Sequence, residues 1–406
     1  MIPEWAMLAT AFAAQAEFCI GYSPLYEAIY THAAAICNMQ AKGEVLQFDE
    51  QALVDLLATE SESRSFMDVN ALELSLLFTS AIHASVLNED PEADPISRFF
   101  PTVGGSYEPE WDRDVLLQML GGLYMKPGPT LRAFLRNGRV QTNEVSRGAG
   151  WLLTASVLTA WAGGDLPITL VDLGCSAGLN LVADQQTWTW SASDGDRTLG
   201  SGDPLIQQRL DFGEVEQEVR EALPVGLITP PQIVARHGFD THPLDPTNAD
   251  MLLNLRAVIW GDQVARLERF DRAIAAYHTA QPPPQLHQGN IIADARRLPD
   301  YVVPRTRLLL VFNSAVTIYF ADAEYAALRE SIIEAFRALP AGVKGLWLEL
   351  EVARERELST LPKLSALKAH MLIDGDLTTR YLAYAEPHPQ TWMLLKGWSD
   401  LRSLIE

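Results

Sequence analysis

The sequence is poor in cysteine and in long apolar runs. Its 406 residues include only three cysteines, Cys19, Cys37 and Cys175, too few and too scattered for a disulfide framework. No Cys-x-x-Cys pair and no recurrent spacing of histidine and carboxylate residues indicates a metal site. Apolar runs fall short of the ~20 residues that span a bilayer, and the first residues lack a signal-peptide pattern. We therefore expect a cytoplasmic protein with no metal and no membrane anchor.

Positive charge is scarce as well. Lysine and arginine number 31 against 52 aspartate and glutamate residues, which gives a net charge of -21. Such a chain repels nucleic acid and anionic membranes, so we expect a small-molecule substrate instead. The hydrophobic fraction of 48% and the absence of low-complexity tracts predict a chain that is folded nearly throughout. Its length favours one large domain with a smaller attachment, and its oligomeric state is not indicated.

The chain has two regions with different hydrophobic patterns. Residues 1–140 have the apolar spacing of helices joined by short loops, and Asn70 with Glu73 forms a capping box. The helices are expected over 6–20, 25–39, 71–87, 112–124 and 130–137. A further helix over 144–162, capped by Thr142 or Asn143 and stopped by Gly163-Gly164, leads into the second part. We expect an all-helical cap domain over 1–140 that covers the carboxyl ends of the strands in the second domain, with the active site between the two.

Residues 141–406 have the pattern of an α/β domain. Short β-branched runs alternate with amphipathic helices, which is typical of a parallel sheet covered on both faces. The parallel strands are expected over 168–172, 233–237, 289–293, 307–313 and 345–351. Residues 379–385 and 391–396 flank a proline-rich turn and predict an antiparallel hairpin at the end of the chain. The irregular stretch over 187–231 is interpreted as an insertion.

The strongest local signal is the run from Thr169 to Leu181, in which a hydrophobic strand enters a glycine turn and then a helix. Such a turn brings backbone N–H groups and a helix N-terminus to a ligand. A dinucleotide fingerprint starting at Gly174 requires glycine where Ser176 and Leu179 stand. A phosphate-binding P-loop requires a lysine that this segment lacks. Both phosphate-binding interpretations therefore fail.

The turn Asp172-Leu173-Gly174-Cys175-Ser176-Ala177-Gly178 instead resembles motif I of class I S-adenosylmethionine-dependent methyltransferases. It is similar to the Asp-Leu-Gly-Cys-Ser-Ser-Gly turn of plant carboxyl methyltransferases, which slightly favours an oxygen acceptor. The resemblance implies a Rossmann-like sheet, S-adenosylmethionine as cofactor, and an Asp172 carboxylate that orients the cofactor's amino group. The implied cofactor-binding residues of this segment are Asp172, Gly174, Ser176, Gly178 and Asn180.

Three further cofactor contacts are expected where later strands end. Asp240 follows the second strand and is the candidate for the ribose hydroxyls, although it would alternatively close a loop with Thr241 and His242. Asp294, near the third strand, is the candidate for the adenine amino group. Asn313 ends the fourth strand, where it would contact cofactor or substrate, or cap the next turn.

Polar residues expected to face the active-site crevice are the candidates for catalysis. They are His83, Glu144, Arg147 and His237. The alternative for His83 is a packing role on an otherwise apolar helix. Glu144 and Arg147, three residues apart, would alternatively form an ion pair on a helix surface. Methyl transfer depends mainly on positioning, so a catalytic triad is not expected.

The whole chain also resembles a bacterial family, domain of unknown function 2332. The matching segments are Ser23-Pro24-Leu25-Tyr26, Gln141 to Arg147, Ser176 to Leu181, and Arg236 to Asp240 with Pro243-Leu244-Asp245. The resemblance implies a methyltransferase-like fold with a helical N-terminal region and brings no substrate. We expect a methyltransferase that acts on an oxygen or nitrogen atom of a small molecule. The alternative is a related protein that binds S-adenosylmethionine or a similar nucleoside without methyl transfer, or with other chemistry.

Overall fold

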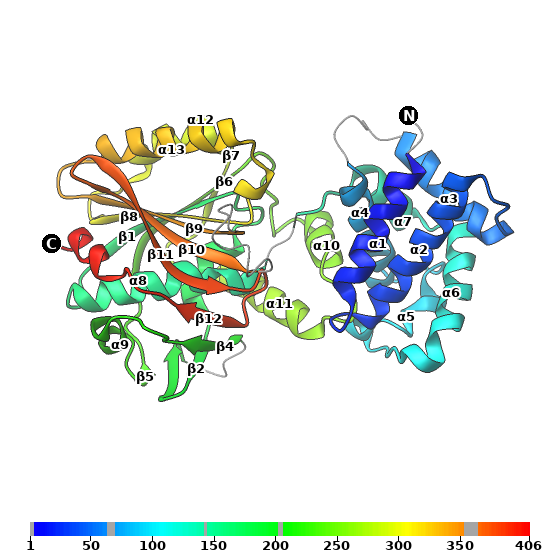
Figure 1. Cartoon of the computed structure of the whole chain (residues 1–406), viewed down its shortest axis with the longest axis horizontal. Helices are drawn as coiled ribbons and strands as arrows, with labels where there is room; N and C mark the ends of the chain where they lie inside the picture. The colour runs from blue at the N-terminus through cyan, green and yellow to red at the C-terminus, as the bar shows by residue number, and fades with distance from the viewer. Residues whose placement is uncertain (1–3, 63–69, 142–143, 202–205, 353–363) are drawn as a thin grey trace. The chain divides into compact units, whose positions relative to one another are not determined.

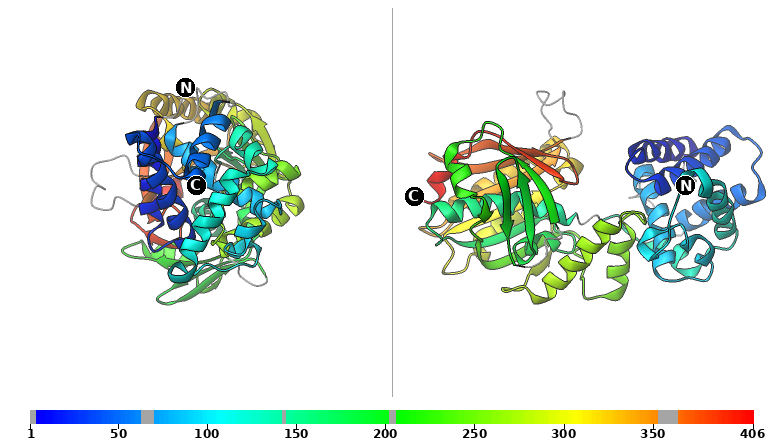
Figure 2. Two further views of the ribbon diagram at one scale, coloured as in Figure 1. Left: turned by 90° about the vertical axis from the view of Figure 1, so that its right-hand side faces the viewer. Right: turned by 90° about the horizontal axis from the view of Figure 1, so that it is seen from below.

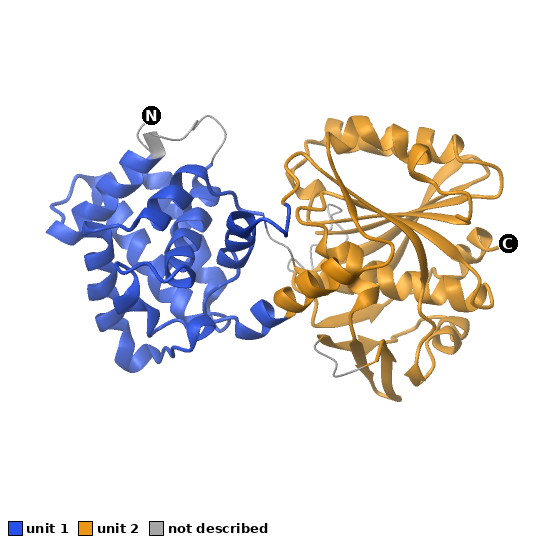
Figure 3. Ribbon diagram, turned by 180° about the vertical axis from the view of Figure 1, so that it is seen from behind, with its two compact units in different colours: residues 1–142, 245–268 blue, residues 143–244, 269–406 orange. Residues whose placement is uncertain are grey.

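The computed structural model describes residues 4–62, 70–141, 144–201, 206–352 and 364–406. The proposed caps Thr142 and Asn143 lie outside the described residues. The chain forms two compact units, coloured separately in Figure 3. Unit 1 contains residues 1–142 and 245–268, and unit 2 contains residues 143–244 and 269–406. Each unit is described by itself.

The described part of unit 1 is helical. Its helices from the N-terminal part of the chain are α1 (Trp5–Cys19), α2 (Pro24–Lys42), α3 (Phe48–Glu62), α4 (Ala71–Leu87), α5 (Asp94–Ser97), α6 (Pro109–Met125) and α7 (Pro129–Asn137), with the 3-10 helix η2 (Pro101–Val103) between α5 and α6. The predicted cap of α4 is confirmed, because the Asn70 side chain accepts a hydrogen bond from Glu73 N at 2.9 Å. Helix α3 was not predicted.

Unit 1 also includes a segment of residues 141–406, which the sequence analysis assigned to the second domain. Residues 245–268 contain α10 (Ala249–Ala257) and the start of α11 (Val264–Thr279). Ala257 belongs to the apolar core of the N-terminal helices, and Trp260 stacks on Tyr26 with ring centroids 5.2 Å apart. Burial of these apolar groups explains why this segment packs with the N-terminal helices and not with the α/β unit.

Unit 2 contains a twelve-stranded sheet within the described residues. The strands are β1 (Pro167–Leu173), β2 (Trp188–Ala192), β3 (Gly195–Leu199), β4 (Ile206–Asp211), β5 (Gly226–Leu227), β6 (Gln232–Asp240), β7 (Gln285–Gln288), β8 (Leu308–Ser314), β9 (Lys344–Val352), β10 (Ser365–Ile373), β11 (Asp376–Ala385) and β12 (Thr391–Leu394). Their order is β5-β3-β2-β4-β12-β11-β10-β9-β8-β1-β6-β7. Strands β7, β6, β1, β8 and β9 pair in parallel, and β9 to β12 pair antiparallel in succession.

Helices cover both faces of the parallel strands (Figures 1 and 2). On one face lie α12 (Ile291–Asp294), the 3-10 helix η5 (Ala295–Tyr301) and α13 (Asp322–Arg337). Their apolar residues share a buried core with alternate residues of β1, including Val171 and Leu173. The 3-10 helix η3 (Val145–Gly148) and α8 (Ala149–Trp161) lie on the other face, where Gly150 approaches the ring of Phe312. Asp172 therefore points to the side of the sheet that α8 covers.

The strand predictions have mixed outcomes. The strands predicted from residues 168, 233, 307 and 345 correspond to β1, β6, β8 and β9, and the C-terminal hairpin corresponds to β11 and β12. The third strand was placed wrongly over 289–293, because β7 ends at Gln288 and α12 begins at Ile291. Asn290 causes this change, since its side chain accepts hydrogen bonds from Ile292 N and Ala293 N and so caps α12.

The stretch over 187–231 adds strands to the sheet. It contains β2 to β5 and α9 (Gln217–Ala222), and β4 pairs in parallel with β12. Buried Trp188 and Trp190 stack with ring centroids 5.5 Å apart, which gives these strands a core of their own. The sequence predicted neither these strands nor β10. The observed architecture is thus a mixed α/β unit with a mostly parallel sheet, beside a helical unit.

Candidate functional site

The glycine turn lies where the strand order reverses. Strands β6 and β7 lie on one side of β1, whereas β8 and β9 lie on the other. The chain leaves β1 towards β6 and leaves β8 towards β9, in opposite directions along the sheet, and ligands of open α/β sheets bind at such a point. Gly174, which follows β1, packs directly against Val316, which follows β8.

The turn has an unusual backbone conformation. Gly174, Ser176 and Gly178 have φ angles of 78°, 51° and 72°. The left-handed region costs a residue with a Cβ atom about 1–2 kcal/mol, so Ser176 must be held there by its surroundings. Its backbone N–H donates to Asp240 Oδ2 at 2.9 Å, and Gly174 N donates to Phe239 O at 2.7 Å. The end of β6 thus holds the turn in shape.

Asp172 carries a buried carboxylate. The residue is 2% exposed, and its Oδ2 atom is buried without a hydrogen-bond partner among the described residues. Burial raises the pKa of Asp172 well above its usual range, and the nearby Asp240 charge raises that pKa further. An unpaired buried carboxylate oxygen is costly, so this atom is a candidate to receive a ligand's donor.

Asn180 adds a second unpaired oxygen on the 3-10 helix η4 (Leu179–Gln185), which follows the turn. Its side-chain Oδ1 is buried without a hydrogen-bond partner in the described part of the chain. Its backbone oxygen accepts a hydrogen bond from Trp151 Nε1 at 2.9 Å, which fixes η4 against α8. The backbone of Asn180 is therefore held in place close to the turn, and its side-chain oxygen has no partner among the described residues.

Asp240 is the last residue of β6, which extends three residues beyond the predicted strand, and it is 9% exposed. Its carboxylate accepts two backbone hydrogen bonds, from Ser176 N to Oδ2 and from His242 N to Oδ1 at 2.8 Å. These contacts fit the loop-closing alternative. Since a carboxylate has about four acceptor positions, two positions are still available to ribose hydroxyls.

Asp294 and Asn313 occupy different settings from those expected. Asp294 is the last residue of α12, so it does not end a strand, and it lies against Gly289. Asn313 is the second-last residue of β8 and is fully buried. Its amide donates to Glu351 Oε1 at 2.8 Å and accepts from Trp347 Nε1 at 2.6 Å. Cofactor contacts of both residues stay predictions.

Glu351, at the end of β9, was missed by the sequence analysis. Its Oε1 atom also accepts hydrogen bonds from Val316 N at 2.7 Å and Thr317 N at 3.0 Å, which shapes the loop after β8. Its Oε2 atom is buried without a hydrogen-bond partner among the described residues, and burial raises the pKa of Glu351. Only the topology, which places β9 beside β8, could have indicated this residue.

The structure brings Glu144 and Arg147 together with His388, a residue that the sequence analysis did not select. Glu144 precedes η3, and its Oε2 atom lies 3.0 Å from His388 Nδ1. Arg147 Nε donates to Pro387 O at 2.9 Å. Glu144 and Arg147 thus contact the turn between β11 and β12, which is far from them in sequence.

The two remaining candidates lie elsewhere. His237 is on β6, where its Nδ1 atom is 3.1 Å from His287 Nε2 and its ring packs near Tyr301. Burial and the His287 charge lower the pKa of His237 to about 4. His83 lies in the core of unit 1, where its ring contacts Ala257 O and Thr102 Oγ1, and burial lowers its pKa to about 4. These contacts fit the packing alternative for His83.

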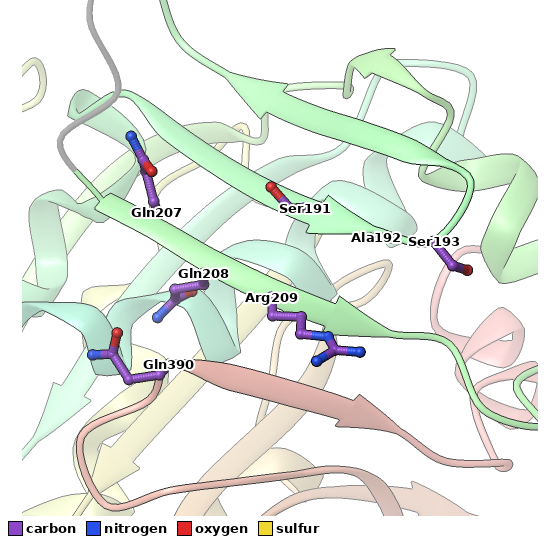
Figure 4. A pocket seen from close by; sticks show the side chains of 7 residues that line it. All are labelled: Ser191, Ala192, Ser193, Gln207, Gln208, Arg209 and Gln390. Carbon is purple, nitrogen blue, oxygen red and sulfur yellow. The ribbon is translucent and has the colours of Figure 1, made fainter.

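A surface depression of about 390 Å³ lies over β2, β4 and the start of β12 (Figure 4). It borders the turn that carries His388, because Gln208 lines it and also donates to Pro389 O at 2.9 Å. The lining residues are Ser191, Ala192, Ser193, Gln207, Gln208, Arg209 and Gln390. Gln208 is buried and also accepts hydrogen bonds from the Trp190 and Trp392 indole N–H groups. Its amide therefore supports the fold.

Comparison with known proteins places the chain in a family. Among the described residues, no helix has both the length and the apolar character needed to cross a bilayer. The chain has no match among curated proteins. One family, described as "Uncharacterized protein conserved in bacteria (DUF2332)", matches residues 9–393. Since this match covers nearly the whole sequence, the chain belongs to the DUF2332 family.

Proposed function

We propose that unit 2 binds S-adenosylmethionine at the turn 172–178 and transfers its methyl group to an oxygen or nitrogen atom of a small molecule. One observation carries this proposal. A turn with three left-handed residues lies at the point of strand-order reversal, directly after a buried carboxylate with an unpaired oxygen. This combination suits a small ligand that has a cationic amino group.

Asp172 is the residue that would hold the amino group. An ammonium group beside Oδ2 would supply the missing hydrogen-bond donor and would favour the ionised carboxylate. Since burial raises the pKa of Asp172, ligand binding should release a proton where the carboxyl group is protonated in the free protein. A phosphate group would be repelled by Asp172 and Asp240, which argues against NAD and ATP.

The remaining contacts follow from the turn and from β6. Asp240 would accept ribose hydroxyls at its free acceptor positions while it continues to hold Ser176 N and His242 N. The glycines have packing roles as well, because a Cβ atom at Gly178 would lie 2.7 Å from Leu286 Cδ2. Replacement of Gly178 would therefore disturb the fold in addition to any ligand.

The bound cofactor would supply an electrophilic methyl group on a sulfonium centre. The protein's part is to hold the acceptor in line with that group, since positioning accounts for much of the rate of such a displacement. Asp172, held on β1, and Asn180, fixed by Trp151, would place the cofactor relative to the end of the sheet.

A thermal-shift assay with S-adenosylhomocysteine, S-adenosylmethionine, NAD and ATP tests the proposal, combined with a screen for turnover of the methyl donor. We expect the first two ligands alone to raise the melting temperature. A shift with NAD and none with S-adenosylhomocysteine would overturn the assignment. Binding of S-adenosylmethionine without turnover of any acceptor would favour a binding protein.

A further inference from the structure

Glu144, which is buried, and His388, which is partly exposed, form a carboxylate–imidazole pair in unit 2. His388 Nδ1 lies 3.0 Å from Glu144 Oε2, and Glu144 Oε1 accepts a hydrogen bond from Ser146 Oγ at 2.6 Å. The Glu144 side chain is 3% exposed, whereas that of His388 is 25% exposed. The carboxylate is thus enclosed, and the imidazole is the part of the pair that solvent or a small molecule reaches.

The position of His388 is held from several sides. Pro387 and Pro389 flank it and restrict the backbone of its turn. Arg147 Nε donates to Pro387 O at 2.9 Å, and Gln208 Nε2 donates to Pro389 O at 2.9 Å. A reactive group needs such support from neighbouring residues, because a shift of about 1 Å is enough to reduce the rate strongly.

The pair adjoins the segment that follows the glycine turn. Glu144 precedes η3, and η3 packs against η4. Gly148 on η3 packs against Ala183. A Cβ atom at Gly148 would lie 3.6 Å from Asn180 Oδ1. Trp151, one turn further along α8, donates to Asn180 O. The pair is therefore at the same end of the sheet as the proposed cofactor site.

We infer that His388 is the proton acceptor of the proposed reaction and that Glu144 is its positioning residue, an inference that rests on the proposed function. A carboxylate at Nδ1 favours the tautomer that carries the proton on Nδ1 and leaves Nε2 basic. Nε2 takes the proton of a hydroxyl acceptor while its oxygen forms a bond to the methyl carbon, or takes the proton of an ammonium acceptor before its nitrogen forms that bond. The carbon–sulfur bond breaks, its electron pair stays on sulfur, and the imidazolium later returns the proton to water.

A general base at this position indicates which class of acceptor the protein methylates. A hydroxyl group or a protonated amine must lose a proton, so it benefits from a base, whereas a carboxylate acceptor is already ionised at neutral pH. The pair therefore favours a hydroxyl or amine acceptor over a carboxylate. This conclusion differs from the similarity of the turn to that of carboxyl methyltransferases.

The first test needs no acceptor. In protein with 15N-labelled histidine, NMR should show neutral His388 with its proton on Nδ1, and Glu144→Ala should shift the tautomer population towards a proton on Nε2. A proton on Nε2 in the wild-type protein would overturn the inference. Binding of S-adenosylhomocysteine, measured in the same sample, reports separately on the proposed function.

The second test uses His388→Asn, in which the amide N–H can still donate to Glu144 but cannot take a proton. With a panel of hydroxyl, amine and carboxylate acceptors, we expect turnover with hydroxyl or amine compounds and a loss of about 10²–10⁴-fold in His388→Asn. Affinity for S-adenosylhomocysteine should stay unchanged, and the control His278→Asn, at an exposed position of α11, should keep full turnover. Full turnover in His388→Asn, turnover of carboxylates alone, or no turnover by a protein that binds S-adenosylhomocysteine would overturn the inference.

Discussion

Replacement of Asp240 by alanine should destabilise unit 2 even without a ligand. The change removes the acceptor of two backbone N–H groups, those of Ser176 and His242. Each donor left unsatisfied costs about 1–3 kcal/mol, so the free energy of unfolding should fall by about 2–6 kcal/mol. Because Asp240 is 9% exposed, water can reach part of the site, and the lower half of this range is expected.

Urea-induced unfolding, followed by tryptophan fluorescence, measures this loss. Asp240→Asn keeps one acceptor oxygen, so its loss should be about half as large. Asp300→Ala is the matched control, because Asp300 is an exposed residue whose contact with Arg297 spans 3.5 Å. A change below about 0.5 kcal/mol in Asp240→Ala would refute the loop-closing role. Unchanged S-adenosylhomocysteine affinity in the folded variant would instead remove the ribose role and return the search to acids over 187–231, such as Asp211 or Asp203, of which Asp203 lies outside the described residues.

Further predictions concern the charge, the turn and acid stability. Asp172→Asn should leave the free protein as stable or more stable, because an ionisable group is no longer buried, yet weaken S-adenosylhomocysteine binding about 10- to 100-fold in calorimetry. In the wild type that affinity should rise with pH as Asp172 ionises, and this dependence should vanish in Asp172→Asn. Gly178→Ala should cost more stability in urea than Gly375→Ala, since both have positive φ but only Gly178 meets a side chain, that of Leu286. The pKa of His237 is lowered from 6.5 to about 4. The stability that neutral His237 contributes should therefore be lost as the pH falls from about 6.5 to about 4. In thermal melts at a series of pH values, His237→Gln should show a smaller loss.

Features encoded by short stretches of sequence were predictable. Helix α4 begins at Ala71 because Asn70 caps it, and both bounds of the predicted helix match the structure. The hydrophobic runs of β1 and β8 lie in the buried centre of the sheet, where both faces are covered. The same periodicity failed at 289–293, because the capping side chain of Asn290 outweighs a short apolar run.

Features that depend on distant contacts were not predictable. The segment 245–268 belongs to unit 1 because Trp260 stacks on Tyr26 and Ala257 contacts His83, which are 234 and 174 positions earlier in the chain. His388 comes beside Glu144 only because the turn between β11 and β12 is fastened to η3 by Arg147 and Gln208. Neither pairing leaves a periodic signal in the sequence.

Isothermal titration calorimetry of the wild-type protein with S-adenosylhomocysteine tests the central claim most directly. The unpaired oxygen of Asp172 at the glycine turn predicts saturable binding at one site per chain. The proton released on binding should make the observed heat differ between buffers of different ionisation enthalpy. NAD and ATP should give no heat beyond dilution. Absence of S-adenosylhomocysteine binding by folded protein, or equal binding by Asp172→Asn, would contradict the account.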